Sequence, residues 1–269
     1  AAVGELSFKE TTLGNQTFKA PGFGIFLAAI GVDIDLKPLP IVINDLGVGL
    51  FVNPAPEIEE IVRRHVGLNN SDLDQADFFT ALNDYKDSFS DQMTFLEMYL
   101  YGKISIPKDK VLSGKALILL ATDKVRIDCK FDIGDTTMQK ICKLTARGFL
   151  EVGVPQDMSS WPYAAGNLTF AAAPGTNGGG DKFIRLPSLG EAALEFYIAG
   201  PETWALHGYL DTYLFALLHT DFEFFIGPPG FVVNGSVTKG FDVVVVKVEA
   251  GMEVCVFFRW NEPRIWGGY

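Results

Sequence analysis

The feature that most constrains this chain is a succession of short apolar-alternating segments between residues 194 and 266. Each segment is rich in Phe, Val and Ile, and each stops at a cluster of turn-forming residues. The segments cover residues 215–226, 231–237, 241–248 and 252–260. Strands of this length, separated by Gly, Pro and Asn, are typical of an antiparallel meander. We therefore predict a mainly β fold, arranged as a sandwich, a barrel or an open repeat sheet.

The most regular strand pattern covers Lys124–Ile133. Apolar side chains occupy every second position, and Lys, Arg and Asp occupy the positions between them. This alternation predicts a strand with one face on a core and the other face in water. We expect the apolar positions to face the core and Asp128 to face water.

Residues 54–95 form the one stretch with helical periodicity. Acidic residues precede basic ones, which matches the polarity of a helix dipole. The apolar residues recur at spacings of three and four, and they are Ile58, Ile61, Val62 and Val66. A second helix is predicted from Ser71, where a capping box begins. We expect a single β-rich domain over 1–269, with residues 54–95 as a small helical insertion.

Charge and hydropathy argue against two classes of partner. The chain carries 22 Lys and Arg against 33 Asp and Glu, for a net charge of −11. No basic cluster provides the electrostatic footprint of a nucleic-acid-binding surface. The longest uncharged apolar stretch, 23–32, is far shorter than the ~20 residues of a membrane-spanning helix. Because the final strand pattern stops abruptly, we expect the chain to be a fragment of a longer protein.

Sequons and cysteines bear on the compartment. Four of the ten asparagines lie in N-x-S/T sequons, and they are Asn15, Asn69, Asn167 and Asn234. This enrichment favours an extracellular, secreted glycoprotein. Cys129 and Cys142 flank a predicted turn, so a hairpin disulfide between them is possible. We expect Cys255, on an apolar strand, to be a small buried hydrophobe.

Two short stretches carry a resemblance to known proteins. They read Gly-Pro-Pro-Gly-Phe-Val-Val-Asn-Gly-Ser at 227–236 and Pro-Gly-Phe-Gly-Ile at 21–25. These strand-turn units resemble parts of very large repeat-built β-rich proteins of unknown function from fungi and bacteria. No catalytic residue is attached to the resemblance.

One group of polar residues is a candidate for chemistry. It comprises Glu202, His207, Asp211, His219, Asp221 and Glu223. Alternation places His219, Asp221 and Glu223 on one face of a strand, and an antiparallel neighbour would bring His207 and Asp211 beside them. Such a set suits a divalent metal or, through Asp221 and Glu223, glycoside hydrolysis. The favoured interpretation is a solvated hairpin face, so we assign no catalytic residue, cofactor or metal.

Three classes of function remain open. The favoured class is a structural or interaction module of an extracellular β-rich protein, such as a surface, filament or adhesin component. Its partner would be a second copy, or further segments of the same chain, joined by strand pairing at edges that lack protective Lys and Pro. The first alternative is a binding module for a lipid or other apolar ligand in a β groove or barrel. The second is a secreted carbohydrate-active enzyme that uses Asp221 and Glu223.

Overall fold

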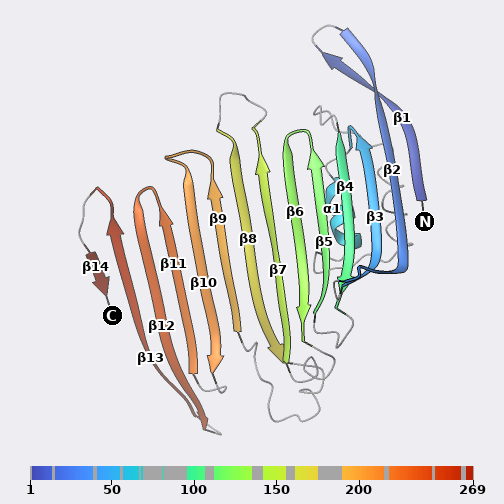
Figure 1. Ribbon diagram of the computed structural model, residues 1–269. Coiled ribbons are helices and arrows are strands. Elements are labelled where there is room, and N and C mark those ends of the chain that lie inside the picture. The colour runs from blue at the N-terminus through green and yellow to red at the C-terminus, as the bar shows by residue number, and fades with distance from the viewer. Residues whose placement is uncertain are drawn as a thin grey trace. The chain divides into compact units, whose positions relative to one another are not determined.

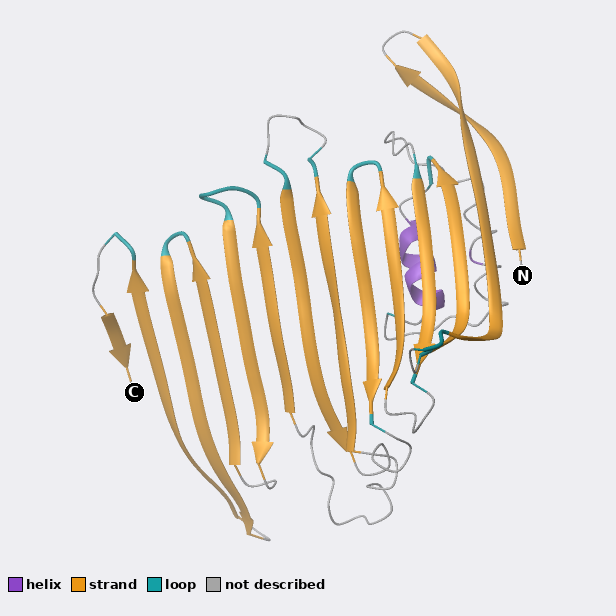
Figure 2. Cartoon of the chain, in the orientation of Figure 1, coloured by secondary structure: helices purple, strands orange, loops and turns teal. Residues whose placement is uncertain are grey.

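The computed structural model confirms the predicted mainly β meander with a small helical insertion (Figures 1 and 2). It describes residues 2–13, 16–38, 41–54, 57–66, 68, 81, 96–106, 112–134, 142–155, 161–174, 190–214, 218–243, 246–261 and 265–268. The chain divides into two compact units, Ala1–Lys130 and Phe131–Tyr269. Each unit is described separately below.

Unit 1 contains six strands and the helix. They are β1 (Ala2–Leu13), β2 (Gln16–Asp35), β3 (Val42–Val52), α1 (Glu57–Val66), β4 (Glu97–Ser105), β5 (Leu112–Ala121) and most of β6 (Lys124–Ile133). Unit 2 contains β7 (Cys142–Gly153), β8 (Tyr163–Pro174), β9 (Gly190–Ile198), β10 (Trp204–Leu214), β11 (Leu218–Gly227), β12 (Gly230–Val243), β13 (Val246–Arg259) and β14 (Ile265–Gly268). Neighbouring strands follow chain order, and within neither unit does the first strand pair with the last. Each unit is therefore an open sheet and not a barrel.

Helix α1 covers one face of the unit 1 sheet, as its sequence predicts. The stripe Ile58, Ile61, Val62 and Val66 is buried, with Val62 fully inaccessible. On the sheet side, the buried residues that join this core are Phe26, Phe51, Tyr99, Tyr101, Leu117 and Leu119. The described part of the chain contains no helix long and apolar enough to cross a membrane. The second helix predicted from Ser71 lies outside the described residues, apart from Ala81.

Glycines make room for the aromatic rings of this core. A Cβ on Gly47 would lie 2.4 Å from Cδ1 of Tyr101, and a Cβ on Gly49 would lie 2.9 Å from ring atoms of both Phe26 and Phe51. Such approaches are closer than any real Cβ contact, so only glycine fits at these positions. The glycines of β3 therefore let the rings lie flat across the strand beneath α1.

Strand β6 forms as predicted, but its two faces are reversed. Asp128 is only 4% exposed, whereas Val125 and Ile127 are 44% and 40% exposed. Asp128 accepts a hydrogen bond from Arg63 of α1 at 2.9 Å, and Lys124 donates to Glu59 of α1 at 2.7 Å. The expectation that the charged side faces water is wrong because a charged flank of the helix, not a hydrophobic core, packs beside this strand.

The unit 2 sheet has two chemically distinct faces. One face, here called the apolar face, presents only aliphatic, aromatic and small side chains over most of its extent. Strand register and alternation assign it Leu150, Val152, Leu168, Phe170, Leu194, Phe196, Ile198, Leu206, Leu210, Phe222, Phe224, Val233, Val237, Met252 and Val254. Many of these are exposed, including Ile198 at 50% and Met252 at 63%. No described residue of unit 2 covers this face.

The opposite face, here called the polar face, carries the hydrogen-bonding and charged groups of unit 2. Its members include Arg147, Glu151, Asn167, Glu191, Glu195, His207, Tyr209, Asp211, His219, Asp221, Glu223, Asn234, Ser236 and Glu253. Cys255 also lies on this face and is exposed. The prediction that Cys255 is buried is wrong because the sheet is a single layer at this point.

Candidate binding trough on the polar face of unit 2

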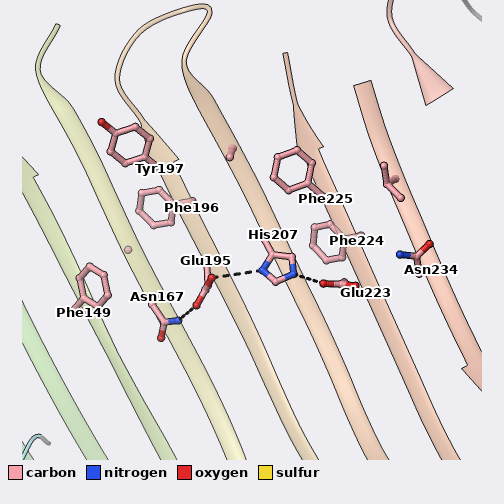
Figure 3. A pocket seen from close by; sticks show the side chains of 13 residues that line it. Phe149, Asn167, Glu195, Phe196, Tyr197, His207, Glu223, Phe224, Phe225 and Asn234 are labelled. Atoms are coloured by element: carbon pink, nitrogen blue, oxygen red, sulfur yellow. Dashed lines mark hydrogen bonds and ion pairs between the residues drawn. The ribbon is translucent and has the colours of Figure 1, made fainter. Parts of the chain in front are cut away.

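A shallow trough of about 730 Å³ crosses the middle strands of the polar face. Four polar side chains from β8, β9, β10 and β11 cross it in a row (Figure 3), and they are Asn167, Glu195, His207 and Glu223. Register places Asn167 opposite Glu195 and Glu195 opposite His207, because β8, β9 and β10 are antiparallel neighbours. Glu223 lies diagonally from His207, opposite Tyr209.

The row is joined by hydrogen bonds and an ion pair. The Asn167 amide donates from Nδ2 to Oε1 of Glu195 at 2.6 Å. His207 Nε2 lies 2.8 Å from Oε1 of Glu223, and its Nδ1 lies 3.5 Å from Oε2 of Glu195. Because each ring nitrogen faces a carboxylate, the protonated imidazole satisfies both contacts at once. The imidazole ring therefore lies between two carboxylate side chains, one at each ring nitrogen.

The contacts of His207 shift its titration. The hydrogen bond to Glu223 raises the pKa of His207 above its ordinary value; burial opposes this shift, and the bond to Glu195 adds to it. The side chain is still 30% exposed. The two glutamates are about half exposed, at 51% for Glu195 and 54% for Glu223. Water therefore reaches all three groups.

Aromatic side chains border the polar row. Phe149 lies opposite Asn167, and Phe225 lies opposite His207. Tyr197, two residues beyond Glu195, stacks on Tyr163 with ring centroids 6.3 Å apart. Ala205 lies opposite Tyr197, and its small side chain leaves space beside the ring. The trough thus combines aromatic borders with a charged centre, as small-molecule sites commonly do.

The structure brings together most of the predicted polar group, but in separate pairs. His207 contacts Glu223, while His219 Nε2 contacts Oδ1 of Asp211 at 2.9 Å. Asp221 accepts a hydrogen bond from Ser236 of β12. Glu202 lies apart, exposed in the turn between β9 and β10.

These pairs bear on the two chemical interpretations of the group. Among the described residues, no three His, Cys, Asp or Glu side chains converge in a way that could hold a metal ion. Of the proposed glycosidase pair, Glu223 is in contact with His207 and Asp221 with Ser236. Glycoside hydrolysis requires two carboxylates that flank an open cleft. Neither of these contacts creates that arrangement, so the geometry does not support Asp221 and Glu223 as a glycosidase pair.

Sequence reasoning missed half of the trough. Glu195 was not singled out, nor were the rings of Tyr197 and Phe225, and Asn167 was predicted only as a glycosylation site and not as part of a binding site. A signal for Glu195 was present, since a hairpin centred on the turn at 199–203 places it opposite His207. Asn167 would then follow from the next strand pairing.

The predicted modification sites divide between described and undescribed residues. Asn167 and Asn234 lie within strands on the polar face and border the trough, not in turns. Thr169, the hydroxyl residue of one sequon, donates to Oδ1 of Asn167 at 3.0 Å. Asn15, Asn69 and the Cys142 side chain lie outside the described residues, so glycosylation there and a Cys129–Cys142 disulfide stay predictions.

Comparison with protein-family models, with curated proteins and with solved structures finds no match. The functional argument therefore depends on the two faces of unit 2.

Proposed function

We propose that this chain is a structural module of an extracellular β-rich protein, and that it assembles with a second copy through the apolar face of unit 2. The observation that carries the proposal is the exposure of that face, where Leu168 and Leu194 lie side by side, each 42% exposed. Monomeric proteins seldom leave a contiguous apolar patch of more than a few hundred Å² in water.

The size of the face suits a dimer. Seven strands at a spacing of ~4.8 Å, each with roughly eight residues on a rise of ~3.3 Å, cover on the order of 800 Å². A standard protein interface buries about 800 Å² on each partner. A second copy of the same face is an apt occupant, because two sheet faces that are apolar over most of their extent can stack at ~10 Å. The described residues of the face include no carboxylate. They include one cationic side chain, Lys239, toward the end of β12.

The polar groups are compatible with this arrangement. Asn167 and Asn234 both lie on the polar face, so glycans there would point away from the proposed interface. Strand pairing offers a second contact at β13, because β14 pairs only with the segment Cys255–Phe258 of that strand. Among the described residues, none pairs with the outer edge of the neighbouring segment 246–254, so its backbone groups could accept another strand.

Sedimentation velocity on the full chain, from about 1 to about 200 µM, tests the proposal over the range where moderate interfaces dissociate. The wild-type protein should dimerise or form larger species. The variant Leu168→Glu/Leu194→Lys keeps the net charge and places opposite charges side by side within one sheet, so the monomer should tolerate it. This variant should be monomeric.

The matched control changes the polar face of the same unit. Thr145→Glu/Ala171→Lys also joins opposite residues of neighbouring strands, and it should associate like the wild type. A wild-type protein that stays monomeric throughout would overturn the proposal. Association that persists in Leu168→Glu/Leu194→Lys would also overturn it, and would assign the contact to strand pairing at β13.

A further inference from the structure

We propose that the trough on the polar face of unit 2 binds a small organic cation, with its ammonium group at Glu195 and Glu223 and its apolar body against Tyr197 and Phe225. This proposal is independent of the assembly at the apolar face, because the two sites lie on opposite faces of the sheet.

The charge of the trough sets the sign of its ligand. Its lining contains two carboxylates and one imidazole, and neither Lys nor Arg. Carboxylates only accept hydrogen bonds when ionised, so a ligand must arrive as a donor. The chain as a whole, at −11, also attracts cations and repels anions.

The carboxylates have room for such a donor. Glu195 uses one oxygen for Asn167 and the other for His207, while Oε1 of Glu223 contacts His207. Each carboxylate has about four lone-pair positions, and both side chains are half exposed. An ammonium group can therefore approach from the solvent side without displacing the row.

The aromatic border selects for an apolar body attached to that charge. Tyr197 is 44% exposed and Phe225 is 41% exposed, so both rings remain accessible to a ligand in the trough. Aromatic faces attract cations and also provide apolar contact area. The volume of about 730 Å³ falls in the range of small-molecule sites. An arylalkylamine matches both the ring border and the charged centre.

His207 acts as an internal competitor for the same carboxylates. The groups that face its ring are Glu195 from β9, Glu223 from β11 and Tyr209 on its own strand, whose hydroxyl donates to Glu191. When His207 is protonated, it neutralises part of the negative charge that would attract a ligand. Loss of its proton leaves the two glutamates without an internal cation, so cation binding should strengthen as pH rises.

Calorimetric titration of the full chain, prepared without N-glycans because Asn167 and Asn234 border the trough, tests the proposal with four probes. They are phenethylammonium, the neutral 2-phenylethanol, the anionic 3-phenylpropionate and the disaccharide cellobiose. The cation should bind about fivefold to tenfold more tightly than the alcohol, the gain expected from a partly exposed ion pair with cation–π contact. Its affinity should rise between about pH 5.5 and pH 8, where a histidine titrates, and this rise should vanish in His207→Gln.

Two double variants locate the site. Glu195→Gln/Glu223→Gln should remove the preference for the cation over the alcohol. Glu202→Gln/Glu253→Gln removes the same number of charges from exposed positions outside the trough and should preserve the preference. The proposal is overturned if the alcohol or cellobiose binds as tightly as phenethylammonium, if the cation does not bind, or if both double variants lose the preference equally. The probe series alone decides the matter if a variant fails to fold.

Discussion

Replacement of Gly47 by Ala tests the packing rule that shapes unit 1. The new Cβ would lie 2.4 Å from Cδ1 of Tyr101 and 3.3 Å from Cζ of Phe26. Both rings are buried, at 9% and 1% exposure, and Tyr101 also packs edge-on against His65 of α1 at 6.2 Å. Because the rings lie between sheet and helix, they cannot move aside freely.

The magnitude follows from two opposing terms. Overpacking of a well-packed core costs about 1–3 kcal/mol. Loss of glycine's backbone freedom in the unfolded chain returns about 0.5–1 kcal/mol. We expect Gly47→Ala to destabilise unit 1 by about 1–2 kcal/mol. The control is Gly102→Ala on the neighbouring strand β4, where the nearest atom to a Cβ is Cδ2 of Leu46 at 3.8 Å. It should be neutral or slightly stabilising.

The assay must report on unit 1 alone. All four tryptophans lie in unit 2, so their fluorescence follows the wrong part of the chain. Hydrogen exchange measured by mass spectrometry on peptides from β3, β4 and α1 reports locally. Gly47→Ala should speed the exchange of these peptides by roughly 5- to 30-fold. A change of less than about twofold, or an equal change in Gly102→Ala, would refute the reasoning.

Three further predictions concern titratable groups. Asp128→Asn should destabilise unit 1 by about 3 kcal/mol in urea unfolding, because it leaves the largely buried Arg63 without this charged partner. The control Asp132→Asn changes a more exposed side chain and should cost under about 0.5 kcal/mol. Burial raises the pKa of Glu97, so the stability that its neutral form provides is complete at low pH and is lost as pH rises through the raised pKa. The protection of β4 amides, taken relative to the intrinsic exchange rate at each pH, should therefore fall with rising pH in wild type and stay constant in Glu97→Gln. The raised pKa of His207 likewise gives unit 2 a stability that is present below the ordinary histidine pKa and lost above the raised value, and tryptophan fluorescence during urea unfolding should show this trend in wild type but not in His207→Gln.

Local patterns in the sequence predict the elements well, because alternation and helical spacing are properties of neighbouring residues. The helix stripe from Ile58 to Val66 is confirmed in full, and so is the shared face of His219, Asp221 and Glu223. Alternation does not say which side of a strand meets a neighbouring element. The reversed faces of β6 show this, since Asp128 binds not only its neighbour Arg126 but also Arg63 of α1, more than sixty residues earlier.

The trough was harder to predict because it depends on register across several strands. His207 lies on β10 and Glu223 on β11. If the pairing between these strands shifted by one residue, the two side chains would lie on opposite faces of the sheet. The turn centred on Pro201 fixes Glu195 opposite His207, and the turn at 227–230 fixes Glu223 opposite Asn234. The aromatic border then requires that Tyr197 and Phe225 remain accessible, which depends on the single-layer sheet and not on any local motif.

The glycines of unit 2 link its surface shape to its proposed assembly. On the apolar face, Gly166 lies opposite Phe196 and Gly208 lies opposite Phe224. A Cβ on either glycine would lie 2.4 Å from the facing ring, so each ring lies down across its neighbouring strand. Rings in this position protrude less from the sheet, so the face is flatter. A flatter face can make continuous contact with a second sheet at ~10 Å. In unit 1 the corresponding rings lie beneath α1, whereas in unit 2 we infer that a second copy of the chain takes the place of the helix.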